Sequence, residues 1–302
     1  MQAFASPIVA LLTPFDARGN IAWQAFESYL TALSAWGVRS VITNGTTAEF
    51  SSLTLDERQR VAEFVRHHFQ GTVINNVSSP CVNDARKLIH GTIGFSDAVM
   101  ILPPYYYAGV HNDGLCRFFE KALSGVSLPI FLYHFPQHTG NRIDNDLIEM
   151  LLARDIQISG IKDSGGKLDN ALAYQSRFPK LQLYYANDAQ ALEALQRGLT
   201  GLVSGGANPL PEFLIALQKY FGKSNEEAKT LQGRFNTWND YRTASPLFEI
   251  PLVKAAMGAR TRNFPVHVRP PFTPASAKEI RQVRNTVFGC LADLRGILER
   301  LS

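Results

Sequence analysis

The amino-acid sequence predicts an α/β protein, a (β/α)8 barrel with a C-terminal helical extension, from three observations. Eight short apolar runs recur along the chain and start roughly 20–34 residues apart. The segments between the runs carry apolar residues at helical spacing, an alternation typical of a parallel sheet covered by helices. After Gly222 the alternation stops, and the remaining segments look helical throughout. We expect residues 1–222 to form the barrel and residues 223–302 the extension, packed together as one structural unit.

The predicted strands are rich in Val, Ile, Leu, Phe and Tyr, and each ends in turn-forming residues, as buried parallel strands do. Eight such strands are the number that closes a (β/α)8 barrel. In chain order, the runs are Ile8–Phe15, Val38–Gly45, Thr72–Ser78, Ala98–Pro104, Pro129–Pro136, Ile158–Ser164, Leu181–Asp188 and Gly201–Asn208.

Helix signals lie between these runs. The segment Trp23–Gly37 places its apolar residues on one face and ends at a glycine suited to a helix C-terminus. The segment Thr54–Phe69 begins with a threonine followed three residues later by Glu57, the pattern of a capping box. The segment Asp188–Leu199 begins in a similar way, with Asp188 as the expected N-cap. Beyond the barrel, about three helices are expected in "NEEAKTLQGRFNTWNDYR", "PLFEIPLVKAAMG" and "PASAKEIRQVRNTVFGCLADLRGILERL".

The composition narrows the class of protein. A net charge of +4 without a concentrated basic segment does not favour nucleic-acid binding. The three cysteines, Cys81, Cys116 and Cys290, are far apart and lack metal-ligand spacing, so free thiols in a reducing compartment are expected. The N-terminal segment has no basic region before its apolar run, and no run approaches the roughly 20 residues that span a bilayer. We expect a soluble cytoplasmic protein that binds neither nucleic acid nor membrane.

The active site of such a barrel lies at the carboxyl ends of its strands. Among the polar residues there, we find neither a cluster of acids or histidines typical of a metal site nor a glycine-rich phosphate loop. We therefore expect no metal and no cofactor. The polar residues at the predicted strand ends include Thr13, Asn44, Thr46, Thr47, Glu49, Tyr105, Tyr106, Tyr107, Tyr133, His134, His138, Lys162, Asp163, Asn187, Asp188, Ser204 and Gly205.

Lys162 is the residue that suggests a chemistry. It stands where the apolar run "ISGI" passes into the turn "DSGG". Burial lowers the pKa of a lysine side chain, and the neutral amine is then a nucleophile that forms a Schiff base with a ketone or aldehyde. The protonated imine is an electron sink that permits C–C cleavage or formation. Taken alone, Lys162 would rather be read as one of the common strand-end lysines, solvated or paired with Asp163.

Schiff-base chemistry also needs a proton carrier and a site for the substrate carboxylate. Tyr133 lies one strand before Lys162, so its hydroxyl could reach the same cavity. The hydroxyls of Thr46 and Thr47, in a turn led by a glycine, suit an anion. Ser204 and Gly205 are expected to line the pocket of the keto acid.

Six segments, in order and across nearly the whole chain, carry a resemblance to a known family. They are "NGTTAEFSSLT", "LPPYYY", "LYHFPQHTG", "GIKDSGG", "GLVSGGAN" and "VRPPFTP". Together they resemble the dihydrodipicolinate synthase / N-acetylneuraminate lyase superfamily of class I, pyruvate-dependent aldolases. The resemblance implies that Lys162 forms the imine and Tyr133 acts as acid and base. It also implies that Thr46 links Tyr133 to Tyr106, and that Thr46 and Thr47 hold the keto-acid carboxylate.

In this family the residue matching Tyr106 is typically supplied across a dimer interface, so the resemblance implies a homo-oligomer, a dimer or tetramer. The run "YYY" leaves the position of that tyrosine uncertain by one residue.

Departures from the family pattern bear on the substrate. His138 stands where the lysine-pathway synthases carry an arginine, His134 replaces an asparagine, and Ala48 replaces a glycine. A histidine cannot reproduce a bidentate guanidinium. We therefore expect cleavage or condensation of the 4-hydroxy-2-oxoglutarate or 2-keto-3-deoxy-sugar-acid type. The alternatives are a dihydrodipicolinate synthase that condenses pyruvate with aspartate semialdehyde and uses His138 in place of the arginine, and a non-catalytic keto-acid sensor. His138 could also be an exposed loop residue.

Overall fold

The computed structural model describes residues 2–261 and 263–301. Eight parallel strands pair in sequence order, and β8 pairs with β1, so the sheet closes into a barrel. The predicted (β/α)8 fold is confirmed. Each strand lies within its predicted run, and turn residues of the run follow it. They are β1 Ile8–Ala10, β2 Ser40–Thr43, β3 Thr72–Asn76, β4 Ala98–Ile101, β5 Ile130–His134, β6 Ile158–Asp163, β7 Gln182–Tyr185 and β8 Gly201–Ser204.

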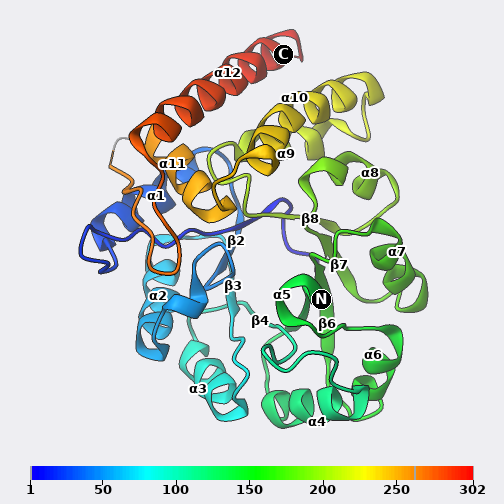
Figure 1. The fold of residues 1–302 in the computed structure, drawn as a ribbon. Coiled ribbons are helices and arrows are strands. Elements are labelled where there is room, and N and C mark those ends of the chain that lie inside the picture. The colour runs from blue at the N-terminus through cyan, green and yellow to red at the C-terminus, as the bar shows by residue number, and fades with distance from the viewer. Residues whose placement is uncertain (1, 262, 302) are drawn as a thin grey trace.

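Helices α1 to α4 and α6 to α8 follow one another around the outside of the barrel, whereas the short helix α5 lies inside this ring of helices (Figure 1). Two short 3-10 helices, η1 Phe50–Ser52 and η2 Asp188–Gln190, lie after β2 and β7. The helices of the barrel are α1 Trp23–Ala35, α2 Leu55–His68, α3 Val82–Thr92, α4 Asn112–Leu123, α5 Pro136–Thr139, α6 Asn145–Leu152, α7 Leu168–Arg177, α8 Ala191–Gln196 and α9 Pro211–Tyr220.

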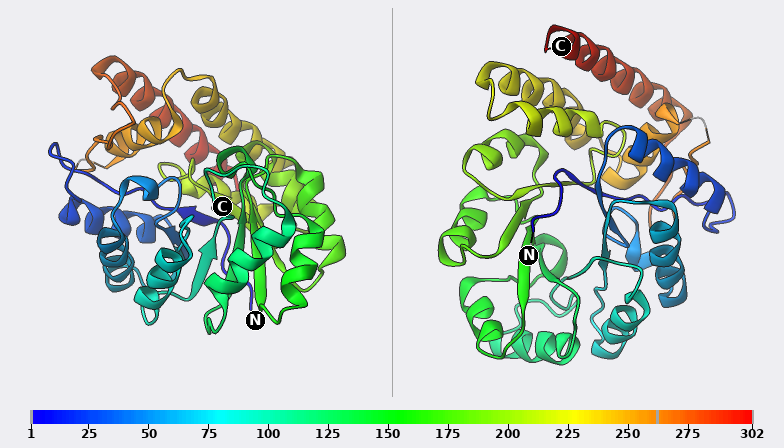
Figure 2. Two further views of the ribbon diagram at one scale, coloured as in Figure 1. Left: turned by 60° about the horizontal axis from the view of Figure 1, so that its bottom comes forward. Right: turned by 180° about the vertical axis from the view of Figure 1, so that it is seen from behind.

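The three further helices expected after the barrel are present as α10 Asn225–Ala244, α11 Glu249–Arg260 and α12 Ala277–Leu301. They pack against one another on one side of the ring of strands, where Figures 1 and 2 show them in yellow to red. Helix α10 also contacts α8, α9 and η2. The extension therefore lies beside the carboxyl end of β7, where η2 begins.

The helix ends test the predicted caps. Thr54 and Glu57 form the expected capping box of α2, and Gly37 follows α1 with φ +93°, a left-handed conformation that glycine adopts readily. The expectation that Asp188 caps a helix is wrong. Asn187 takes that place, since its side chain accepts a hydrogen bond from the N–H of Ala189. The Asp188 carboxylate turns instead toward Arg242 of the extension.

Two apolar cores flank the sheet. The larger one fills the space between strands and helices. The smaller one fills the inside of the barrel with side chains such as Ile42, Ile74, Met100 and Phe131. Because side chains alternate across a strand, Tyr133 joins the inner core while its neighbour Leu132 joins the outer one. At the carboxyl end of the barrel, polar residues follow the apolar side chains of the inner core.

Candidate active site

Strands β5 and β6 bring Lys162 and Tyr133 together. The two residues are direct partners in the parallel register, and both line one cavity at the carboxyl end of the barrel. The Lys162 Nζ lies 4.0 Å from the centroid of the Tyr133 ring. Lys162 is 6% exposed and Tyr133 is 2% exposed. The two residues expected to act as nucleophile and proton carrier are therefore neighbours in an almost closed site.

The turn after β2 brings two hydroxyl groups to the same place. Thr46 Oγ1 lies 3.3 Å from the Tyr133 hydroxyl, a hydrogen bond in which either oxygen can donate. Thr47 lies against Gly205, at the end of β8, where a Cβ would stand 2.3 Å from Thr47 Oγ1. Only glycine permits that approach without a shift of the turn. The two threonines thus connect the lysine–tyrosine pair to the opposite wall of the barrel.

One cavity of about 300 Å³ unites these groups. A larger hollow of about 780 Å³ lies beside the loops that follow β4 and β5, and it contains none of the predicted site residues. We consider the smaller cavity the candidate active site because it holds the buried amine. The predicted residues that line it are Thr46, Thr47, Tyr133, His138, Lys162, Ser204 and Gly205.

His138 and Ser204 also have defined surroundings. His138 belongs to the short helix α5 and is exposed, and its ring stacks on Phe135 with 3.9 Å between the ring centroids, so it lines the rim of the cavity. Burial lowers the pKa of His138, and the charge of Glu249 opposes this shift. Ser204 Oγ accepts a hydrogen bond from the N–H of Ala207 at 2.8 Å. Both side chains are held in place before any substrate arrives.

Tyr106 does not reach this cavity within its own chain. Its side chain is 88% exposed, and its φ of +85° is uncommon for a residue with a side chain. Its ring packs against the neighbouring Tyr107, with 5.3 Å between the centroids. The role that the family resemblance implies, donation of Tyr106 to a partner subunit, stays a prediction.

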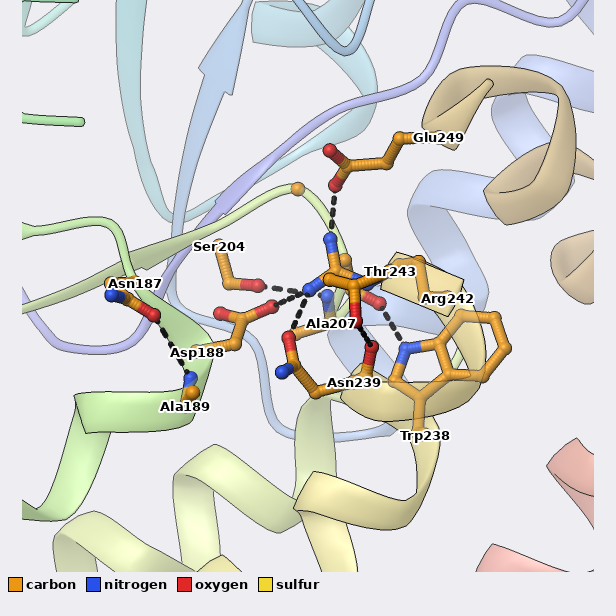
Figure 3. A network of polar contacts seen from close by, with 12 residues as sticks. Asn187, Asp188, Ala189, Ser204, Ala207, Trp238, Asn239, Arg242, Thr243 and Glu249 are labelled. Atoms are coloured by element: carbon orange, nitrogen blue, oxygen red, sulfur yellow. Dashed lines mark hydrogen bonds and ion pairs between the residues drawn. The ribbon is translucent and has the colours of Figure 1, made fainter. Parts of the chain in front are cut away.

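Helices α10 and α11 of the C-terminal extension line the distal wall of the cavity, and Figure 3 shows the polar contacts of the side chains there. Arg242 of α10 donates from Nη2 to Asp188 Oδ2 at 2.7 Å and to Asn239 Oδ1 at 2.8 Å. Its Nη1 contacts the carboxylate of Glu249, the first residue of α11. A Cβ at Gly206 would stand 2.3 Å from the Arg242 Cζ, so a glycine there makes room for the guanidinium.

Burial raises the pKa of Asp188, whereas Arg242 and a hydrogen bond from Ser204 favour its ionised form. Arg242, Asn239 and Glu249 were not among the site residues predicted from the sequence. A signal was present in α10, whose buried residues follow helical spacing and include Arg242 among apolar side chains. A charged residue on a buried helix face is usually paired with an opposite charge.

A second buried lysine anchors the threonine turn. Lys254 of α11 forms an ion pair with Glu49, with 2.5 Å between Nζ and Oε1, and both side chains are 0% exposed. Lys254 also donates to the carbonyl of His267 at 2.8 Å. Burial lowers the pKa of Lys254 to about 8, although Glu49 opposes the shift. Since Glu49 follows Thr47 by two residues, this pair ties the turn to the extension.

A pair of titratable groups lies behind the catalytic strands. His134 and Asp163 are partners in the β5–β6 register, and both are 0% exposed. Burial lowers the pKa of His134 to about 4 and raises that of Asp163 to about 6. Asp163 Oδ1 accepts a hydrogen bond from the N–H of Gly165 at 2.7 Å, so Asp163 orients the loop after Lys162.

In residues 2–261 and 263–301, no group of three or more His, Cys, Asp or Glu side chains is arranged to hold a metal ion. Within the same described part of the chain, none of the helices is both long and apolar enough to span a membrane.

The structure is thus a (β/α)8 barrel with a buried lysine, Lys162, at the carboxyl end of its sixth strand. Residues 3–288 match the family model of the dihydrodipicolinate synthetase family, and the chain belongs to that family. It is a carbon–carbon lyase, so the alternative of a non-catalytic sensor is set aside.

Curated relatives agree with this assignment. An uncharacterized DapA-like lyase of Chloroflexus aurantiacus is 28% identical over 284 residues, which are 92% of this chain and 94% of the relative. A 4-hydroxy-tetrahydrodipicolinate synthase of Staphylococcus haemolyticus is 33% identical over 218 residues, 69% of this chain and 72% of the relative.

Solved structures share the fold. A catalytic-lysine mutant of the Ruminococcus gnavus sialic acid aldolase superposes with a TM-score of 0.89 at 18% identity, and the match covers 96% of both chains. A variant of the Sulfolobus solfataricus 2-keto-3-deoxygluconate aldolase superposes with a TM-score of 0.87 at 23% identity, over 96% of this chain and 98% of the other.

Proposed function

We propose that the protein is a class I aldolase that cleaves or forms a C–C bond through an imine between Lys162 and an α-keto acid, with pyruvate as the keto-acid product or substrate. The observation that carries the proposal is the chain of contacts from Lys162 to Tyr133 and from Tyr133 to Thr46, inside one small cavity. A buried amine beside a phenol hydroxyl has the nucleophile and the proton carrier that this chemistry needs.

In the cleavage direction, Lys162 Nζ adds to C2 of the keto acid, and loss of water gives the protonated imine. Removal of the proton from the C4 hydroxyl then breaks the C3–C4 bond and releases an aldehyde. The electron pair of that bond moves into the imine and leaves an enamine of pyruvate. Protonation at C3 and addition of water free pyruvate and regenerate the amine. The imine is the electron sink, so we propose that the reaction uses no metal or cofactor.

Tyr133 moves the protons in this scheme. Its ring lies 4.0 Å from Lys162 Nζ, and Thr46, 3.3 Å from its hydroxyl, can accept its proton or return one. The resemblance to the family extends this relay to Tyr106 of a second copy of the chain. The exposed Tyr106 ring is compatible with such donation. We therefore propose a homo-oligomer, a dimer or tetramer, with a cytoplasmic location.

The keto-acid carboxylate needs hydrogen-bond donors at a fixed distance from Lys162. The hydroxyls of Thr46 and Thr47 line the cavity on the side of β2. The Lys254–Glu49 ion pair holds this turn from behind. The carboxylate and the carbonyl carbon of the substrate would thereby be placed together, so that imine formation occurs between pre-oriented groups.

Exchange of the pyruvate methyl hydrogens with deuterium tests the proposal without knowledge of the aldehyde. Imine and enamine must interconvert for exchange, and ¹H NMR follows the loss of the methyl signal in D₂O. We expect exchange with the wild type, none above the buffer rate with Lys162→Ala, and slow exchange with Tyr133→Phe. Equal rates for the wild type and Lys162→Ala would contradict the mechanism.

The alternative reaction, condensation of pyruvate with aspartate semialdehyde, is measured in parallel with condensation with glyceraldehyde. If aspartate semialdehyde is the faster substrate, the protein is a dihydrodipicolinate synthase in which His138 replaces the arginine.

A further inference from the structure

We propose that the distal end of the cavity selects an uncharged, hydroxylated substrate tail, and that Glu249 is the specificity-determining residue that excludes a second acidic group. This inference rests on the proposed aldolase function and concerns the part of the substrate that becomes the aldehyde. Such selectivity would favour sugar-acid substrates over dicarboxylates such as 4-hydroxy-2-oxoglutarate and over phosphorylated sugar acids.

The cavity extends from Lys162 to a wall made by the extension. The end of β7 and helices α10 and α11 contribute side chains there, and Figure 3 shows their arrangement. A substrate whose carbonyl carbon is at Lys162 would direct its tail toward this wall. The residues of the wall are Asn187, Asp188, Asn239, Arg242, Thr243 and Glu249.

Arg242 is the fixed cation of this wall, and its guanidinium is already occupied. On the buried side, Asp188 forms an ion pair with Nη2 at 2.7 Å. On the open side, Glu249 forms an ion pair with Nη1. The side chains of Arg242 and Asp188 are 8% and 7% exposed, whereas that of Glu249 is 52% exposed. An acidic substrate tail would therefore meet Glu249 before it met the guanidinium.

The charges of the cluster do not attract an anion. One guanidinium and two carboxylates have a net charge of −1. If Glu249 turned away into solvent, the remaining Arg242–Asp188 pair would be neutral. In neither arrangement does the wall offer the net positive charge that stabilises a carboxylate or phosphate in a partly buried site. A second acidic group would instead add a like charge close to Glu249.

Hydroxyl groups fit the same wall. A carboxylate accepts hydrogen bonds through four lone-pair sites, and Arg242 occupies only part of the Glu249 carboxylate. Asn187, Asn239 and Thr243 add amide and hydroxyl groups along the wall. A polyol tail can therefore donate to Glu249 without displacing Arg242.

Condensation of pyruvate with matched aldehydes tests the inference. Glyceraldehyde and glyceraldehyde 3-phosphate differ only in the acidic group, and glyoxylate carries a carboxylate beside its carbonyl. The ratio of kcat/KM for glyceraldehyde to that for each acidic aldehyde is compared in the wild type, Glu249→Gln and Glu149→Gln. Glu149 is the control because it forms a similar pair with Arg177 at 2.6 Å on exposed helices α6 and α7.

We expect the wild type to prefer glyceraldehyde and Glu249→Gln to reduce the ratio about tenfold, since one neighbouring charge is removed. Glu149→Gln should keep the wild-type ratio. The inference is overturned if the wild type uses an acidic aldehyde as well as the neutral one, if it uses neither, or if Glu249→Gln leaves the ratio unchanged. Deuterium exchange of pyruvate alone reports the proposed function separately, because it requires no aldehyde.

Discussion

Replacement of Lys254 by methionine tests how the extension supports the active site. The substitution keeps most of the side-chain volume but removes the ammonium group that lies 2.5 Å from Glu49 Oε1 and 2.8 Å from the His267 carbonyl. The Glu49 carboxylate then stays fully buried, and the N–H of Arg269, 2.9 Å from Oε2, is its remaining hydrogen-bond donor. Loss of one partner of a buried ion pair costs about 3–5 kcal/mol of unfolding free energy.

This loss is a large part of the roughly 5–15 kcal/mol that stabilises a typical protein. The double variant Glu49→Gln/Lys254→Met removes both charges, and the amide oxygen of the substituted side chain can still accept the N–H of Arg269. We expect the double variant to lose only about 1–2 kcal/mol, because no buried charge is left unpaired.

Urea unfolding followed by far-UV circular dichroism and tryptophan fluorescence measures both losses. Lys167→Met is the control, since Lys167 is exposed and lies at the start of α7. We also expect a higher KM for pyruvate in Lys254→Met, because Glu49 holds the threonine turn. The reasoning is refuted if Lys254→Met unfolds within about 1 kcal/mol of the wild type, or if the double variant is as unstable as the single one.

Three further substitutions have defined outcomes. Tyr133→Phe should lower kcat by about 10²–10⁴ with the fold intact, as steady-state kinetics and circular dichroism would report, and an unchanged kcat would exclude Tyr133 as the proton carrier. Gly205→Ala should raise the KM for pyruvate at least about tenfold, because its Cβ would stand 2.3 Å from Thr47 Oγ1. His134→Asn should make stability less sensitive to acid. The pKa of His134 is lowered by burial to about 4 from 6.5, so between these pH values the unfolded chain binds the proton more tightly and folding weakens as pH falls. Between pH 6.5 and pH 4, the unfolding free energy measured in urea should fall by about 2–3 kcal/mol less in the variant than in the wild type. An equal fall in both proteins would contradict this role of His134.

The features that local sequence can encode were predicted well. The alternation of strands and helices predicts the barrel, and the rule that parallel strands end at one edge predicts that Lys162, Tyr133 and Thr46 lie together. The structure adds the β5–β6 register and the 3.3 Å contact between Thr46 and Tyr133.

The distal wall of the cavity was not predicted from the sequence. Arg242 and Glu249 reach the cavity only because α10 and α11 dock beside the carboxyl end of β7, and no local pattern specifies how a helix pair docks on a barrel. The wrong cap at Asp188 has the same origin, since its carboxylate is taken by a residue 54 positions away. The role of Tyr106 follows neither from the sequence nor from the structure of a single chain, because the active site that it would complete belongs to a second copy of the chain.

The central claim is that Lys162 forms an imine with an α-keto acid, and reductive trapping tests it most directly. The protein is incubated with pyruvate, reduced with borohydride, weighed intact and then digested to locate the adduct. We predict that the wild type and the control Lys167→Ala each gain one reduced pyruvyl group, located on Lys162, and that Lys162→Ala gains none. The absence of an adduct on the wild type, or an equal adduct on Lys162→Ala, would contradict the claim.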